Sequence, residues 1–194
     1  MPHRTSSVAT CRRAVLAACA AMLLATPGAH GDSTALPEYT VKGAFLLNIA
    51  KYATWPPQAF SDAAAPIVIG IAGDDPFGAM LDRIVSGRII NDRKVIVRRS
   101  KKPADLRGAH VVFISASESD RAAAICASLA ESGALCVGDT EGAAASTAIN
   151  FSVESGRIVF SVNLAAVRKS NVGISSKLLQ LAKSVTGTTG KERP

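Results

Sequence analysis

Two adjacent carboxylates, Asp74 and Asp75, are the residues whose type and spacing come closest to a chemical site. They lie in the segment Gly-Asp-Asp-Pro-Phe-Gly, residues 73–78, directly after an apolar run and before a segment with helical spacing. Open α/β sheets place ligands at the carboxyl ends of their strands, and carboxylate oxygens bind divalent cations. We favour the structural interpretation, in which Asp75 caps the following helix and Pro76 occupies its first turn. The segment lacks the glycine spacing and the lysine of a phosphate-binding loop.

Histidine, the commonest general base in enzymes, occurs only once after residue 31. His110 lies in a predicted strand between Ala109 and Val111, without neighbouring cysteine or histidine ligands. This setting is more typical of a histidine packed in a sheet than of a metal ligand or a catalytic base. No nucleophile-elbow motif accompanies it, so a serine hydrolase triad has no support. The sequence therefore predicts a protein that is not an enzyme, with no cofactor and no metal.

Residues 1–31 have the three parts of a secretory signal, which predicts a periplasmic protein. A lipoprotein cleavage site at Cys19 and a twin-arginine signal are alternatives whose patterns the segment matches less closely. An apolar run of 12 residues, 14–25, is too short to span a bilayer. The positive start is formed by Arg4, Arg12 and Arg13, and small residues at Ala29-His30-Gly31 predict cleavage before Asp32.

The cysteine content changes once the predicted signal is set aside, because Cys11 and Cys19 belong to it. The remaining pair, Cys126 and Cys136, would meet an oxidising compartment, which favours a disulfide. Closing a loop of this size would contribute about 2.5–3 kcal/mol of stability on the chain-entropy account. The alternative is a pair of buried thiols, because Cys126 falls in the middle of a predicted helix.

The net charge falls from +7 to +4 when the three arginines of the predicted signal are removed. No stripe of basic residues with interleaved aromatic residues is present, so we expect no binding to nucleic acid. No other run is long and apolar enough to cross a membrane, so we expect no direct insertion of the mature protein.

Strands and helices alternate along residues 32–186, which predicts a single α/β domain. A late hairpin with its turn at Ser155-Gly156 adds antiparallel strands, so we expect a mixed, mostly parallel sheet sandwiched by helices. Ser117 is expected to cap the third helix, and residues 187–194 to form a mobile polar tail. The expected strands are 66–72, 94–98, 109–115, 134–137, 149–153 and 158–162, and the expected helices are 39–55, 77–85, 118–131 and 176–185.

The first expected helix, residues 39–55, carries most of the distinctive side chains. Lys42 falls inside its apolar face, where a snorkelling stem is the favoured interpretation and a charged group at a recognition groove is the alternative. Asn48 and Lys51 lie on its polar side. Trp55 is the only tryptophan and precedes two prolines, so it either seals the core or anchors a partner.

The segment VKGAFLLNIAKYATWP, residues 41–56, resembles the opening block of the YfiR-like family of small secreted proteins. Blocks at residues 67–85 with 90–99, 110–118 and 149–183 resemble the family in the same order, so the resemblance covers nearly all of the predicted domain. The resemblance implies an αβ sandwich without known catalytic activity. It also implies a periplasmic regulator that holds an inner-membrane diguanylate cyclase inactive and responds to redox through disulfides. This chain departs from that pattern, because only one disulfide is possible after the signal.

We therefore expect a periplasmic regulatory protein that binds the extracytoplasmic domain of an inner-membrane diguanylate cyclase or another membrane sensor. The alternative is a periplasmic small-molecule binding module that works with a transporter, a receptor or a sensor kinase. A homodimer is also open, whereas a metal-dependent enzyme built on the paired carboxylates has the least support. The candidate binding residues are Lys42, Asn48, Lys51, Trp55, Asp74, Asp75 and Phe77.

Overall fold

The computed structural model describes residues 37–187. The predicted signal, residues 1–31, lies outside the described residues, and so do residues 188–194 of the predicted tail. Within the described range, no helix combines the length and the apolar character that crossing a lipid bilayer would require.

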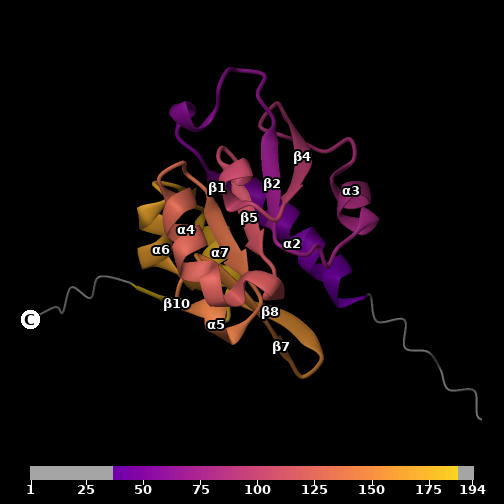
Figure 1. The fold of residues 1–194 in the computed structure, drawn as a ribbon, viewed down its shortest axis with the longest axis vertical. Coiled ribbons are helices and arrows are strands. Elements are labelled where there is room, and N and C mark those ends of the chain that lie inside the picture. The colour runs from indigo at the N-terminus through magenta and orange to yellow at the C-terminus, as the bar shows by residue number, and fades with distance from the viewer. Residues whose placement is uncertain (1–36, 188–194) are drawn as a thin grey trace, which may run out of the picture. The chain divides into compact units, whose positions relative to one another are not determined.

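An eight-stranded mixed sheet forms the centre of the fold (Figure 1). Its strands follow the order β10-β8-β7-β6-β5-β2-β4-β3, and all neighbours are parallel except β7 with β8 and β3 with β4. The expected fold class, a mostly parallel sheet with a late antiparallel hairpin, is thereby confirmed. The strands are β2 (Ile67–Ala72), β3 (Ile89–Ile90), β4 (Arg93–Ser100), β5 (Val111–Ile114), β6 (Leu135–Gly138), β7 (Ile149–Glu154), β8 (Arg157–Asn163) and β10 (Ser184–Thr186).

Helices cover both faces of this sheet, which divides the core into two clusters (Figure 1). Leu46 and Ile49 of α2 pack on one face, together with Leu178 of α7. Ile125 and Leu129 of α4 pack on the other. Because both faces are covered, all six residues of β2 are buried, as expected of a parallel strand that reads as a continuous apolar run. The helices are α2 (Glu38–Tyr52), α3 (Ala79–Val85), α4 (Ala122–Ala130), α5 (Glu141–Ala144), α6 (Leu164–Lys169) and α7 (Ser176–Leu181).

The first helix ends earlier than the sequence predicts. Tyr52 is its last residue, and the next two residues form β1 (Ala53–Thr54) instead of continuing to Trp55. This short strand pairs antiparallel with β9 (Gly173–Ile174), outside the main sheet. The pairing satisfies backbone groups that a further helical turn would otherwise use, and Pro56 prevents the helix from resuming.

Two other predicted helices are also corrected. Residues 116–121 form a 3-10 helix, and α4 begins only after it, at Ala122. The Ser117 hydroxyl does not cap α4, because it accepts a hydrogen bond from the N–H of Asp74 at 3.0 Å. The predicted helix over residues 176–185 ends at Leu181, and residues 184–186 form β10 beside β8.

The β7–β8 hairpin agrees with the sequence prediction. Ser155 and Gly156 have φ values of 48° and 73°, as a two-residue turn of the right twist requires. Phe151 and Phe160 lie opposite each other across the two strands, and both are buried against α2. The short helices α5 and α6, which flank this hairpin in the chain, were not predicted.

Candidate functional site

The candidate residues from the sequence divide between the two ends of α2. The N-terminal end of the helix lies where β2 and β6 finish, because Lys42 contacts Asp139 and Tyr39 contacts Phe77. At the C-terminal end, Trp55 lies near the starts of β5 and β6. Asn48 and Lys51 are exposed on the helix between these groups.

Lys42 forms a buried ion pair at the N-terminal end of α2. Its Nζ lies 2.7 Å from Oδ2 of Asp139, and both side chains are only 3% exposed. Glu38 provides a second carboxylate, and the hydroxyl of Tyr39 donates to the same Asp139 oxygen at 3.0 Å. The ammonium group is therefore not at the solvent rim, and the snorkelling interpretation of Lys42 is wrong. Its role in binding stays a prediction.

The electrostatics of this cluster keep Lys42 charged. Burial alone would lower the pKa of Lys42, but hydrogen bonds to Asp139 and Glu38 outweigh it and raise the pKa above its usual value. Burial and the charge of Asp139 raise the pKa of the Tyr39 hydroxyl, so Tyr39 remains a donor. The cluster is a satisfied network without a free acid or base at neutral pH.

The turn after β2 holds Asp74 and Asp75 apart. Asp75 Oδ1 accepts from the N–H of Phe77 at 2.7 Å, while its Oδ2 meets Nε of Arg99 at 2.6 Å. Asp74 is paired with Lys101 on the surface. Because each carboxylate has its own cation, the two do not converge on a shared metal position. Gly73 has a φ of 90° and packs so closely on the Ser115 and Ser117 hydroxyls that a Cβ would lie 2.4 Å from each.

Asp75 does not cap the following helix, contrary to the sequence prediction. α3 begins at Ala79, after Gly78, and no side chain caps it. Asp75 instead closes the turn that precedes the helix. Phe77, which was expected in the helix, is buried between the rings of Tyr39 and Phe113, with centroids 5.3 and 4.9 Å away.

Trp55 borders a pocket of about 260 Å³ at the other end of α2. The indole is 8% exposed, and its Nε1–H donates to the carbonyl of Gly133 at 2.9 Å, so it seals the core there. The guanidinium of Arg93 lies 3.7 Å from the centroid of Phe60 and donates to the Ala65 carbonyl at 2.7 Å. The pocket thus combines aromatic surface with a fixed positive charge. It is lined by Ala53, Thr54, Trp55, Pro57, Phe60, Ile67, Asn91 and Arg93.

His110 supports this pocket from behind. Its ring packs edge-on against Trp55 and stacks on Phe60 at a centroid distance of 4.5 Å. Nδ1 accepts a hydrogen bond from the N–H of Val68, so the proton of the neutral ring lies on Nε2, which has no hydrogen-bond partner. Burial is the main cause that lowers the pKa of His110 to about 4; the Ala59 carbonyl opposes this shift, and the charges of Arg93 and Arg98 add to it. His110 lies one residue before β5 and not within the strand as predicted, although its backbone hydrogen bonds to Val68 and Leu135 extend the sheet there.

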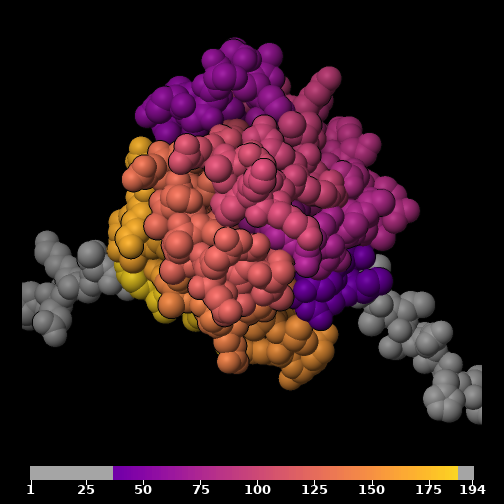
Figure 2. Space-filling view, in the orientation of Figure 1, coloured from indigo at the N-terminus to yellow at the C-terminus, as the bar shows by residue number. Residues whose placement is uncertain are grey.

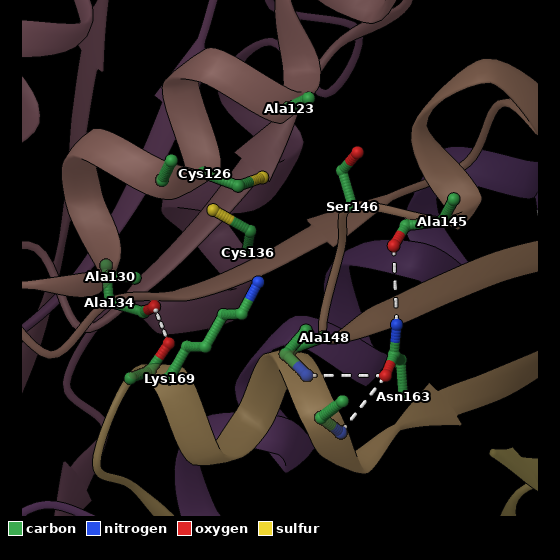
Figure 3. A pocket seen from close by; sticks show the side chains of 14 residues that line it. Ala123, Cys126, Ala130, Ala134, Cys136, Ala145, Ser146, Ala148, Asn163 and Lys169 are labelled. Carbon is green, nitrogen blue, oxygen red and sulfur yellow. Dashed lines mark hydrogen bonds between the residues drawn. The ribbon is translucent and has the colours of Figure 1, made fainter. Parts of the chain in front are cut away.

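A second pocket, of about 330 Å³, opens between α4, α6 and the start of β6. Figure 3 shows the sulfur atoms of Cys126 and Cys136 pointing toward each other at its wall, with the side chain of Lys169 extending into the same space. Both cysteines are buried free thiols. A hydrogen bond with Cys126, together with burial, raises the pKa of the Cys136 thiol well above its usual value, so it is a poor nucleophile. A disulfide between them stays a prediction.

Three residues of these sites were missed by the sequence analysis: Asp139, Phe60 and Arg93. Asp139 directly follows the apolar strand β6, which is the signal that singled out Asp74 and Asp75 after β2. Applying the same rule to every strand would have found it. Phe60 and Arg93 had no local signal, because they meet only through the fold.

Comparisons with known proteins come from sequence and from structure. Residues 39–183 match the family described as YfiR/HmsC-like. Among curated proteins, nothing matches this chain. Among solved structures, the chain is similar to a conserved domain protein from Vibrio cholerae O1 biovar El Tor str. N16961, with a TM-score of 0.52 and 9% identity. The alignment covers 77% of this chain but only 60% of that protein, and at this identity the likeness shows the fold alone.

The substitution Lys42→Met should lower the free energy of unfolding by about 3 kcal/mol, because it leaves Asp139 buried without its cation. Lys51→Met, on the exposed side of the same helix, should change it by less than about 0.5 kcal/mol. Urea denaturation of both variants measures the difference. The double variant Lys42→Met/Asp139→Leu should recover most of the loss, since no charge is left unpaired. Equal losses for Lys42→Met and Lys51→Met would contradict this account of the pair.

Stability should fall between pH 6.5 and pH 4 because of His110. In this window the unfolded chain binds a proton at the imidazole, whereas the folded chain, whose His110 has a pKa of about 4, does not. Proton uptake therefore favours unfolding, by up to about 3 kcal/mol at the acid end. Urea denaturation across this range should show a steeper pH dependence for the natural protein than for His110→Asn, whose amide oxygen can still accept from Val68. Identical slopes would exclude His110 as the origin.

Proposed function

Because the chain belongs to the YfiR/HmsC-like family, we propose that it is a periplasmic, non-catalytic regulator of cyclic-di-GMP signalling. It binds the extracytoplasmic domain of a membrane signalling protein and holds an inner-membrane diguanylate cyclase in its inactive state. The observation that carries this proposal is the family match, which spans residues 39–183 and so nearly the whole described domain. The secretory pattern of residues 1–31 supports the location.

The geometry of the polar clusters supports a structural role for their charges. Lys42 and Asp139 are neutralised by each other, and Asp75 is held by Arg99, so these charges stabilise the fold. His110 is neutral at physiological pH and closed in by aromatic rings. A regulator needs no activated nucleophile or base, and needs only surfaces that a partner can recognise.

Repression sets a quantitative requirement on the interface. A protein that binds the active and inactive states of its partner equally well shifts nothing, however tight the complex. Moving a cyclase from almost fully active to almost fully inactive takes a difference in binding free energy of about 5.5 kcal/mol between the states. The contact must therefore involve partner residues that rearrange between the two states.

Deletion of the gene should raise cellular cyclic-di-GMP, and cross-linking in the periplasm followed by mass spectrometry should capture a membrane sensor. The full chain should restore the lower cyclic-di-GMP concentration, whereas a chain lacking residues 1–31 should not, because it stays in the cytoplasm. An unchanged cyclic-di-GMP concentration after deletion, together with no captured sensor, would contradict the proposal.

The pocket beside Trp55 favours a second candidate function, a small-molecule binding module that serves a transporter, receptor or sensor kinase. A space of about 260 Å³ suits a ligand of amino-acid size. Trp55 and Phe60 line the pocket with apolar atoms, and the guanidinium of Arg93 can pair with an anionic group. A small aromatic or aliphatic carboxylate is the ligand class that this combination fits best.

Titration with a panel of small carboxylates and their uncharged amides should quench or shift the fluorescence of Trp55 for members of the carboxylate set. Thr54→Glu, which fills part of the pocket and adds a charge of the same sign as the ligand, should weaken the response by at least about tenfold. Lys177→Met, an exposed change on α7, should leave it intact. No change in Trp55 fluorescence with any member of the panel would argue against the binding module and would leave the regulatory proposal unaffected.

A further inference from the structure

Positive charge is concentrated in one segment of the described chain. Residues 86–108, which contain β3 and β4, hold eight Lys and Arg residues against two Asp. The other described residues, 37–85 and 109–187, hold nine basic residues against eleven acidic ones. The excess of positive charge therefore belongs to this edge of the sheet and not to the domain as a whole.

Only part of this charge is neutralised within the fold. Arg99 is paired with Asp75 and Asp82, and Lys101 with Asp74. The remaining basic side chains of the segment have no carboxylate partner within residues 37–187, and all but Arg93 and Arg98 are fully on the surface. Those without such a partner are Arg88, Arg93, Lys94, Arg98, Lys102 and Arg107.

Two large apolar side chains are exposed in the same place. Ile89 is 66% exposed and Ile96 is 39% exposed. Ile89 is the cross-strand partner of Lys94, and alternate residues of a strand share a face, so Ile89, Lys94, Ile96 and Arg98 lie on one side of the sheet. α4 covers this side farther in, over β6 (Figure 1). The face combines apolar and cationic contacts.

The backbone of β4 is also open along its outer edge. β3 pairs only with Arg93 and Lys94, although β4 continues to Ser100. The N–H of Val95 points away from β2, to the Arg88 carbonyl at 3.0 Å, whereas the Ser100 carbonyl accepts from Gly73 on the β2 side. Since these directions alternate, Val97 and Arg99 point their N–H and C=O groups outward. No hydrogen bond within residues 37–187 takes up these outward groups.

We propose that an extended segment of the partner protein, whose side chains on one face are acidic and apolar in turn, adds to the sheet beside β4. Its backbone bonds the outward groups of Val97 and Arg99, its apolar side chains cover Ile89 and Ile96, and its carboxylates meet Lys94 and Arg98. This inference rests on the proposed function, since it names the surface through which the regulator meets its partner.

The charge and the open backbone together select this occupant. A second copy of the chain paired through the same edge would bring like charges together, which is unfavourable. An anionic lipid surface would satisfy the cations but offers no alternating N–H and C=O groups. Basic residues on an edge repel basic strands and disfavour pairing with neutral ones, which leave the charges unpaired, but they do not exclude an acidic strand.

The test uses the purified full chain after secretion and three acetylated peptides: Glu-Thr-Ile-Thr-Glu-Thr-Val, its counterpart with lysine in place of glutamate, and the first peptide N-methylated at alternate residues. Only the first should bind and protect the amides of Val97 and Arg99 from hydrogen exchange. Lys94→Glu should weaken binding at least about tenfold, whereas Lys177→Glu on α7 should change it less than about twofold. Equal binding of the N-methylated peptide, or protection elsewhere, would overturn the proposal.

An experiment in cells distinguishes a failure of this inference from a failure of the proposed function. Capture of a membrane sensor by the natural chain but not by Lys94→Glu supports the β4 edge. Capture by both shows that the regulator has a partner but meets it elsewhere, which overturns the inference alone. Co-sedimentation with phosphatidylglycerol vesicles without any peptide-dependent amide protection would assign the basic face to lipid and likewise overturn it.

Discussion

The buried ion pair between Lys42 and Asp139 fixes where the first helix lies on the sheet. A lysine and an aspartate that are both almost fully removed from water are tolerable only when they face each other at hydrogen-bond distance. Sliding α2 by one turn would separate them by about 5 Å and leave two charges buried alone. The pair therefore sets the register of the helix, and through it the contact of Tyr39 with Phe77 and the position of Trp55 at the far end.

The parts of the fold that could be predicted from the sequence are those with a local cause. β2 is a continuous apolar run, and the β7–β8 hairpin combines alternation with a turn that tolerates positive φ. The roles of Asp75 and Asp139 depend on Arg99 and Lys42, which come from other elements, so no local pattern contains them. The end of α2 was misplaced for the same reason, because β9 lies more than a hundred residues farther along the chain.

The same distinction applies to the candidate site. Trp55 could be singled out by its rarity and its prolines, but Arg93 and Phe60, which complete its pocket, could not. The pocket also adjoins the edge of the sheet, since Asn91 and Arg93 line it and β4 begins at Arg93. A small molecule and a protein strand would thus contact the same strand from different sides. If either binding event alters the other, thermodynamic linkage requires the effect to be reciprocal.

The distance along the chain between the two partners of the buried ion pair has a consequence for how the protein acquires its structure. Lys42 and Asp139 are 97 residues apart, and the rings against which Phe45 packs belong to β7 and β8. During synthesis, α2 is followed closely by β2 and α3, which cover part of it, but β7 and β8 emerge much later. The late arrival of these strands delays completion of the core, because their contacts with α2 span most of the chain. It also leaves the apolar helix in need of protection until the last strands arrive.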